Sequence, residues 1–358
     1  MSSAKPRLAV IGGGMAGISL AARAAGDFQV TVLEAESQPA YHSSGRSAAV
    51  AIECYENEVV HALTMPGMDY HLAHGARVLG NVTLADESNL DALAAFEARW
   101  APHCESLEEI SVADLVKRVP ILNPDRITRA LIEKNALSLD AHALLESFRR
   151  MLMARGGQVI GNARVERIER HTGGWRLGWG AATLEADVLV NAAGAWGDQV
   201  AELAGVQPLG LKPLRRTAFL LDLERDVSAW PLVHRVEGGL YFKPEAGLLM
   251  VSPADTNPAE PCDAQPDEYD LAVAADRFQT LTTVEVRRMS HTWAGLRTFL
   301  PDECPAAGFD PEADKFFWLV GQGGFGIQTA PHLSEVAAGL LSGEDHALAG
   351  AIAPDRFR

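Results

Sequence analysis

A glycine-rich turn near the start of the chain constrains the fold more than any other feature. The turn spans residues 12–17, after the apolar run 8–11 and at the start of a stretch predicted to be helical, residues 15–25. A second apolar run, residues 28–33, leads directly to Glu34. This order of strand, glycine turn, helix, strand and terminal acid is typical of the βαβ unit that binds a dinucleotide.

Each glycine of the turn has a distinct expected role. Gly12 allows the tight turn, Gly14 lets the backbone approach a pyrophosphate, and Gly17 lets the helix pack closely on the strand. Glu34, 20 residues beyond Gly14, is placed to accept hydrogen bonds from a ribose. The free N–H groups and the dipole of the helix N-terminus favour the pyrophosphate charge. We expect three neighbours to lie beside the same nucleotide: Met15, Ala16 and Ala35.

Three later segments indicate that the nucleotide belongs to a flavin. Residues 41–49 are small and polar around one arginine, and they suit a backbone that lies flat against a ligand. Residues 187–196 read as a buried strand that ends in a small-residue turn, and residues 318–329 as a strand, a glycine loop and a helix start. NAD needs mainly the first glycine turn. Several such turns predict one longer ligand threaded across one sheet.

The same segments resemble the D-amino acid oxidase and glycine oxidase-like (DAO) family of FAD-dependent oxidoreductases. Within that family the resemblance is greatest to the bacterial D-arginine dehydrogenases. The matching stretches occur in the same order, nearly from end to end of the chain: residues 41–49, 190–196, 215–219, 291–297 and 322–329.

The resemblance implies noncovalently bound FAD. His42 could attach the cofactor covalently in principle, but its counterpart in the resembled family does not. The cofactor-binding residues that the resemblance adds are Ser44, Gly45, Arg46, Ser47, Ala48, Ala49, Val165, Ala193, Gly194, Trp196, Arg297, Gly323, Gly324, Phe325, Gly326, Ile327, Gln328 and Thr329.

Two domains are expected in a chain of 358 residues, because this length exceeds the usual size of a single domain. The fold class is α/β: a Rossmann-like FAD-binding domain with a second, α+β substrate domain built on a mainly antiparallel sheet. The FAD-binding domain comprises residues 1–54, 139–209 and 291–358. The substrate domain comprises residues 55–138 and 210–290.

Four residues are predicted to carry the chemistry. Arg297 lies in a short apolar sequence, and the planar fork of an arginine can hold both oxygens of a substrate carboxylate. A structural ion pair is the alternative, but the clamp arginine of the resembled family falls at this position. The resemblance also places Tyr241, Arg216 and Tyr55 in the active site, whereas Arg215 is expected to be solvated.

The substrate pocket departs from that of the D-arginine dehydrogenases. Val50 and Ile52 stand where those enzymes have histidine and threonine, and Asn81 lies in the region where an acid is expected. A guanidinium side chain without a carboxylate partner is costly to bury, so neutral D-amino acids are the expected substrates. Glu53 could restore the missing charge. Gly324 and Gln328 complete the expected pocket.

The predicted reaction is oxidation of the Cα–N bond of a D-amino acid by hydride transfer to flavin N5, followed by hydrolysis of the imino acid. A helix beginning near Thr329, with Pro331 in its first turn, would direct its positive end at the flavin. No residue stands out as the base. The alternatives are a glycine or sarcosine-type secondary-amine oxidase and a flavin-binding protein without catalysis.

Composition excludes several other roles. The net charge of −16 repels nucleic acid phosphates, and no run of 18 apolar residues predicts a membrane span. The four cysteines are far apart and lack zinc-ligand spacing, so no metal is expected. We therefore expect a cytoplasmic enzyme whose partners are a small amino acid or amine and an undefined electron acceptor, either a quinone, a carrier or oxygen.

Overall fold

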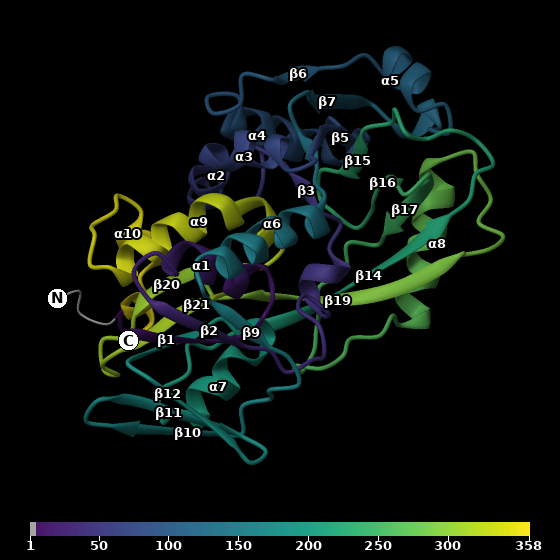
Figure 1. The fold of residues 1–358 in the computed structure, drawn as a ribbon. Coiled ribbons are helices and arrows are strands. Elements are labelled where there is room, and N and C mark those ends of the chain that lie inside the picture. Colours follow the sequence, from purple (N-terminus) through teal and green to yellow (C-terminus); the bar gives the residue numbers. More distant parts are fainter. Residues whose placement is uncertain (1–4) are drawn as a thin grey trace.

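The computed structural model describes residues 5–358 and is built on two large β-sheets (Figure 1). The first four residues of the predicted segment 1–54 lie outside this description. The first sheet has six strands, which are parallel except for β20 at one edge. In spatial order they are β20 (Ala306–Phe309), β21 (Phe316–Val320), β13 (Val188–Asn191), β1 (Arg7–Ile11), β2 (Gln29–Leu33) and β9 (Gln158–Ile160).

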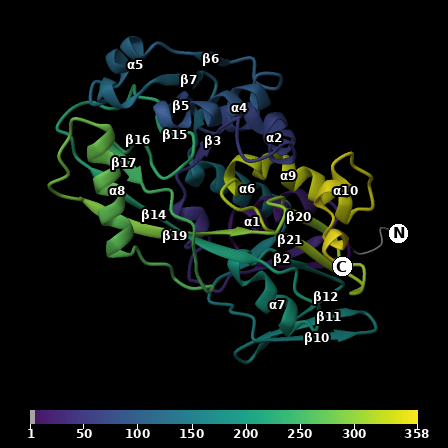
Figure 2. The same cartoon turned by 180° about the vertical axis from the view of Figure 1, so that it is seen from behind.

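Both faces of the six-stranded sheet are covered, as a parallel sheet requires. Three helices lie on one face: α1 (Met15–Ala24), α6 (Ala141–Ala154) and α9 (Gly326–Leu341) (Figure 1). The opposite face carries α7 and a three-stranded antiparallel sheet, which are seen from behind in Figure 2. These elements are α7 (Gly197–Leu203), β10 (Arg167–His171), β11 (Gly174–Trp179) and β12 (Ala182–Ala186).

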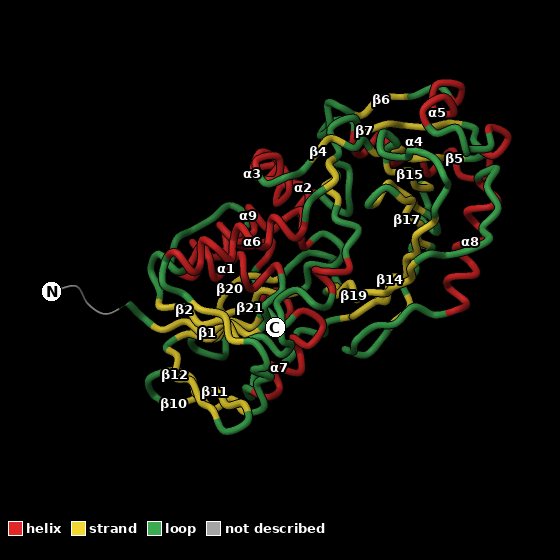
Figure 3. The backbone as a smooth tube through the Cα atoms, turned by 45° about the vertical axis from the view of Figure 1, so that its right-hand side comes forward, coloured by secondary structure: helices red, strands yellow, loops and turns green. Residues whose placement is uncertain are grey.

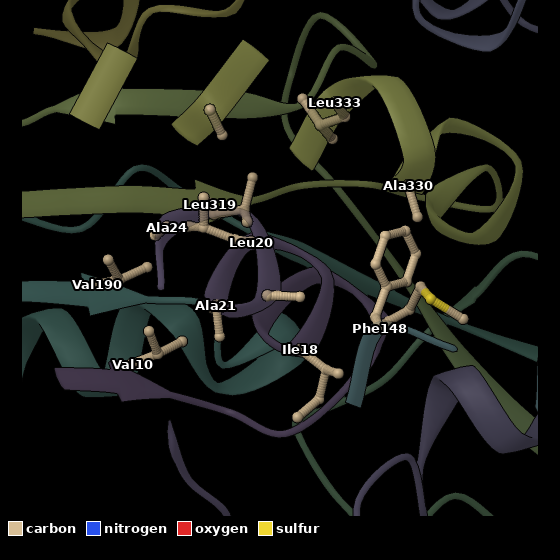
Figure 4. Close-up of a cluster of buried hydrophobic side chains, with 14 of the residues drawn as sticks. Val10, Ile18, Leu20, Ala21, Ala24, Phe148, Val190, Leu319, Ala330 and Leu333 are labelled. Carbon is tan, nitrogen blue, oxygen red and sulfur yellow. The ribbon is translucent and has the colours of Figure 1, made fainter. Parts of the chain in front are cut away.

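The main core lies between this sheet and its three helices (Figure 4). This core includes Val10 and Val190 from the strands, Ala21 from α1 and Phe148 from α6, and all four are fully buried. Asp140 caps α6 by accepting a hydrogen bond from the Ala143 backbone N–H at 2.8 Å, as aspartate commonly does at a helix N-terminus. Close packing of this layer brings the N-terminal ends of α1 and α9 to the same edge of the sheet.

The second sheet has nine strands and is mainly antiparallel; Figure 3 shows it with α8 (Glu268–Leu281) along its outer side. Its apolar core includes Phe242 and Phe278, whose ring centroids are 5.4 Å apart. The strands in spatial order are β18 (Asn257–Pro258), β14 (Lys212–Leu221), β17 (Leu248–Ser252), β16 (Tyr241–Glu245), β15 (Leu232–Arg235), β5 (Asn81–Ala85), β7 (Arg129–Glu133) and β6 (Leu107–Glu109), with β19 (His291–Phe299) paired to β14.

Strand β19 differs from the sequence-based domain boundary. Residues 291–299 were expected in the FAD-binding domain, but β19 pairs with β14 along its whole length, from His291 opposite Leu220 to Phe299 opposite Lys212. Hydrophobic periodicity identifies a strand without identifying its partner, so the sequence did not reveal that this strand joins the second sheet.

Further strands and helices complete the description of residues 5–358. No helix in the described part of the chain combines the length and the apolar character needed to cross a membrane. These further elements are β3 (Val50–Ala51), β4 (Arg77–Val78), β8 (Leu137–Ser138), α2 (Glu58–Thr64), α3 (Met68–Ala73), α4 (Leu90–Trp100), α5 (Val112–Arg118) and α10 (Ala349–Ile352). The described residues also contain six short 3₁₀ segments, which include η1 (Ser43–Arg46) and η5 (Gly194–Trp196).

Two glycines between β1 and the first turns of α1 have no room for a side chain. Gly12 has φ of +108°, and a Cβ there would lie 2.4 Å from the Ala192 carbonyl oxygen. A Cβ on Gly17 would lie only 1.9 Å from the Gly12 carbonyl oxygen. The glycines therefore allow helix and strand to approach as the sequence pattern predicts.

We expect Gly17→Ala to destabilise the fold, because its methyl group must push against backbone rather than a movable side chain. Overpacking of this kind costs about 1–3 kcal/mol or more in the free energy of unfolding. Gly26→Ala is the matched control, since its Cβ would have no atom closer than 3.8 Å. Urea denaturation should separate the two variants, and equal midpoints would contradict the packing argument.

Candidate active site

A cavity of about 1060 Å³ extends from the glycine turn of the first sheet to strands of the second sheet. At one end its wall contains Gly14 and Glu34, and at the other Tyr241 and Arg297. The cavity thus joins the two regions that the sequence analysis assigned to nucleotide and substrate.

At the nucleotide end, Glu34 is fixed by two backbone donors. Its Oε2 accepts from the Gly13 N–H at 2.7 Å and its Oε1 from the Glu36 N–H at 2.8 Å. Each carboxylate oxygen keeps a further lone pair, and the side chain borders the cavity. Gly14 borders it too, and a Cβ there would meet only the Ser44 hydroxyl, at 3.3 Å.

Two buried nitrogens in the cavity wall lack a hydrogen-bond partner among the described residues: Nε2 of Gln322 and Nδ1 of His42. Buried polar groups are nearly always paired in a folded protein. The orphaned nitrogens, the open position at Gly14 and the free lone pairs of Glu34 therefore fit a large polar ligand such as FAD.

The loop of residues 41–49 is anchored to β19. The Ser43 hydroxyl donates to the Leu296 carbonyl at 2.7 Å, and Arg46 donates to the Ala294 carbonyl at 3.1 Å. Arg46 also pairs with Asp263 and donates to the Ala264 carbonyl. The Arg46 guanidinium is thus bound to protein groups, although the side chain still lines the cavity.

Helix α9 begins earlier than its sequence indicated. It starts at Gly326 rather than near Thr329, which puts Pro331 in the second turn. Gly326, Ile327 and Gln328 line the cavity, so the positive end of the helix dipole faces it. Thr329 is buried and its hydroxyl donates to the Phe325 carbonyl within the helix.

Arg297 projects from β19 over the glycine loop at residues 323–324. A Cβ on Gly324 would lie 1.7 Å from Arg297 Nη2, so the guanidinium occupies the space that a side chain at 324 would need. Nη2 donates to the Tyr55 hydroxyl at 2.5 Å and to Glu56 Oε1 at 3.1 Å. The clamp predicted from the sequence therefore already has an acidic neighbour.

Tyr241 and Arg216 lie beside this arginine in the same wall. The Arg216 guanidinium carbon is 5.9 Å from the centre of the Tyr241 ring, and its Nε donates to the Asp255 carbonyl at 2.8 Å. Arg215, expected to be solvated, instead pairs with Asp270 at 2.8 Å. Alternation along β14 explains the difference, because adjacent residues face opposite sides of a strand.

Electrostatics set the protonation states at this end of the cavity. Burial raises the pKa of Tyr55 to about 12 despite the nearby Arg297, so its hydroxyl keeps its proton. Burial lowers the pKa of Arg297, but Tyr55, Glu56 and Tyr241 outweigh that effect, and the net pKa is raised. Arg297 is therefore a permanent cation.

His234 lines the same region but is not free to act as a base. Burial lowers its pKa to about 4. Its Nδ1 lies 3.2 Å from the Arg235 carbonyl oxygen, which can only accept, so Nδ1 carries the proton. Nε2 then accepts from the Thr83 hydroxyl at 3.0 Å.

Five predicted site residues are not part of the cavity wall: Gly17, Gly45, Asn81, Phe325 and Thr329. The other predicted residues do line it: Gly12, Gly14, Met15, Ala16, Glu34, Ala35, Ser44, Arg46, Ser47, Ala48, Ala49, Val50, Ile52, Tyr55, Val165, Ala193, Gly194, Trp196, Arg216, Tyr241, Arg297, Gly323, Gly324, Gly326, Ile327 and Gln328.

Asn81, predicted to face the substrate, does not line the cavity. Asn81 is buried in β5 directly opposite Glu133 of β7, away from the cavity. Glu53 is also outside the wall, and its backbone N–H donates to Glu133 at 2.7 Å.

Sequence reasoning missed several cavity residues because they come from elements distant in sequence. Glu56 gives no signal by itself, since its contact with Arg297 spans 241 positions. The others include Leu232, His234 and Met250 from the second sheet and Phe96 and Trp100 from α4.

The family profile described as "DAO: FAD dependent oxidoreductase" matches residues 7–340, and the chain belongs to this family. Its cofactor is FAD. A glycine oxidase of Pseudomonas aeruginosa is 25% identical over 364 residues, with 95% of both chains covered.

Two other relatives match only in part. The FAD-dependent oxidoreductase domain-containing protein 1 of Xenopus laevis is 26% identical over 179 residues, which cover 44% of this chain and 35% of that protein. The mitochondrial sarcosine dehydrogenase of Mus musculus is 23% identical over 225 residues, which cover 58% of this chain and 24% of that protein. The chain thus matches about a third or less of these longer relatives.

Solved structures share the whole fold. L-proline dehydrogenase from P. horikoshii superposes with a TM-score of 0.86 at 19% identity, covering 99% of this chain and 98% of that one. Glycine oxidase from Geobacillus kaustophilus gives 0.85 at 19% identity, covering 97% and 98%. The likeness to D-arginine dehydrogenases in particular stays a prediction.

We expect Gly14→Val to fold but to bind FAD poorly, because its side chain would enter the cavity rather than the protein interior. Loss of about 1.4 kcal/mol of binding energy weakens binding about tenfold, and we expect at least that effect. Titration of the apoprotein with FAD measures the affinity, and circular dichroism checks the fold. Unchanged FAD affinity would refute the assignment of this turn to the pyrophosphate.

Proposed function

We propose that the chain oxidises the Cα–N bond of a D-amino acid to an imino acid, which water hydrolyses to a 2-oxo acid and ammonia. The arrangement that carries this proposal is a partly buried, permanently charged Arg297 at the end of a cavity that begins at a dinucleotide turn. Bound FAD would supply the acceptor for the hydride. The residues that we expect to hold it are those of the glycine turn, Glu34, the loop 44–49 and the start of α9.

The role of the protein's own residues is to position the substrate. Arg297 can pair with a substrate carboxylate through two parallel hydrogen bonds, which fixes the orientation of Cα. Tyr55 and Tyr241 both lie close enough to Arg297 to influence its pKa, so their hydroxyls are candidates for further hydrogen bonds to that carboxylate.

The side-chain end of the pocket favours apolar substrates. Val50 and Ile52 line the cavity and belong to an apolar cluster with Leu232, against which Tyr55 and Tyr241 pack. We therefore infer that neutral D-amino acids are preferred to cationic ones. The corrected position of Asn81 does not alter this, because Asn81 contributes nothing to the wall.

A second candidate is oxidation of glycine, sarcosine or another secondary amine. Its support is the similarity to a glycine oxidase and to a sarcosine dehydrogenase. Anaerobic bleaching of the flavin by D-amino acids, L-amino acids and N-methyl amino acids distinguishes the two candidates. Bleaching by none of them would favour a flavin-binding protein without catalysis.

Arg297→Met should nearly abolish turnover of carboxylate substrates while the flavin spectrum remains normal. Removal of one buried charge-assisted contact costs about 2 to 5 kcal/mol, a thirtyfold to several-thousandfold loss in kcat/KM. Arg297→Lys is the matched variant, because it keeps the charge and loses the planar fork. Steady-state kinetics within a few-fold of wild type would make Arg297 a purely structural residue.

The apolar wall predicts a higher kcat/KM for D-leucine than for D-arginine, by about tenfold or more, since burying an unpaired guanidinium is costly. Both substrates should be compared at one pH, so that ionisation of the amine does not confound the result. A clear preference for D-arginine would contradict the inference and direct attention to Glu237, an acid in the cavity wall.

A further inference from the structure

The clamp arginine is already paired with an acid of its own chain. Glu56 Oε1 lies 3.1 Å from Arg297 Nη2, and the two side chains are 20% and 16% exposed. The Tyr55 hydroxyl accepts from the same nitrogen at 2.5 Å. A substrate carboxylate that binds Arg297 through both of its oxygens must therefore compete with Glu56 for Nη2.

The backbone holds Glu56 in this position. Its φ is +56°, in the left-handed region that residues other than glycine rarely adopt. Before it, Glu133 accepts hydrogen bonds from the N–H groups of Glu53 and Cys54. After it, Asn57 caps α2 by accepting from the Val60 N–H at 3.0 Å. Two anchored ends leave the short segment between them little freedom, so Glu56 stays near Arg297.

The effect of this acid depends on the charge of the ligand. A simple carboxylate anion that displaces Glu56 leaves a partly buried carboxylate without a cation, which is unfavourable. A zwitterion brings an ammonium group close to its own carboxylate, and that ammonium can pair with the released Glu56. Two other arginines of the cavity wall already have acids beside them. Arg216 Nε lies 3.9 Å from the Asp255 carboxylate. Arg99, whose pKa is raised by Glu58 and also by Glu56, pairs with Glu58 at 2.9 Å.

We propose that Glu56 exchanges Arg297 for the substrate ammonium when an amino acid binds, and that it thereby selects zwitterions over carboxylate anions. Amino acids and N-alkyl amino acids are then favoured over 2-hydroxy acids and plain carboxylic acids. The proposal rests on the proposed function, since it takes Arg297 as the carboxylate clamp. Glu56 acts here as a specificity-determining residue.

Calorimetric titration of the holoenzyme tests the proposal without turnover. The flavin is first reduced with dithionite under anaerobic conditions, so that an amino acid binds without being oxidised. The two ligands are leucine, in the enantiomer that binds more tightly, and 4-methylpentanoate, which has the same skeleton without the amine. Wild type should bind leucine at least about tenfold more tightly, the effect of one ion pair of about 1.4 kcal/mol.

Glu56→Gln should bind 4-methylpentanoate more tightly and leucine more weakly, so that their affinity ratio falls by about tenfold or more. Glu237→Gln is the control, because it also removes one negative charge from the cavity wall but Glu237 does not contact Arg297. In this variant the ratio of the affinities for leucine and 4-methylpentanoate should stay near that of wild type. The absorption spectrum of bound FAD checks that each variant is intact.

Each result bears on the proposal. If the wild-type enzyme binds 4-methylpentanoate more tightly than leucine, the proposal is overturned without any variant. It is also overturned if Glu56→Gln changes the affinity for both ligands by the same factor. Binding of neither ligand to wild type overturns the proposed function as well. Binding of both ligands with a ratio independent of Glu56 overturns only the role of Glu56.

Discussion

The pairing of β14 with β19 is the interaction on which the rest of the structure depends. It runs antiparallel over the full length of β19 and carries Arg216 on one strand and Arg297 on the other. The loop of residues 41–49 is bound to the same strand through the Leu296 and Ala294 carbonyls, and the Trp293 indole donates to the Arg46 carbonyl at 3.1 Å. Thr298 pairs with Gly323 of the glycine loop. One strand therefore positions the clamp arginine and two segments of the cofactor site.

Local patterns were sufficient to predict the βαβ unit. The glycines, the apolar runs and Glu34 lie within about thirty residues, where chain geometry alone decides which groups meet. The Asp140 cap of α6 was predictable for the same reason, because a cap acts within three residues. By contrast, strand periodicity identified β19 but could not assign it to a sheet, since pairing depends on residues far along the chain.

In the candidate site, too, local sequence was not enough to place residues whose position depends on distant parts of the chain. Arg297 and Tyr241 were predicted because the family resemblance supplied long-range information that their own sequence context lacks. Arg215 and Arg216 are adjacent and chemically identical, and only the orientation of β14 decides which one pairs with Asp270 and which one lines the cavity. Asn81 lies outside the cavity wall, and the sequence does not reveal that Glu133 lies opposite it. The positions of Arg215, Arg216 and Asn81 are therefore decided by contacts with residues distant in the sequence, and not by their residue types.

The attachment of both ligand sites to β19 has a thermodynamic consequence. A ligand that orders a shared element lowers the cost of ordering it for a second ligand. If FAD stiffens the loop bound to Leu296, it also stiffens the strand from which Arg297 projects, and a carboxylate held by Arg297 acts back on that loop. Such linkage is reciprocal, so an occupied substrate site would raise the affinity for the cofactor by the same factor by which the cofactor raises the affinity for the substrate.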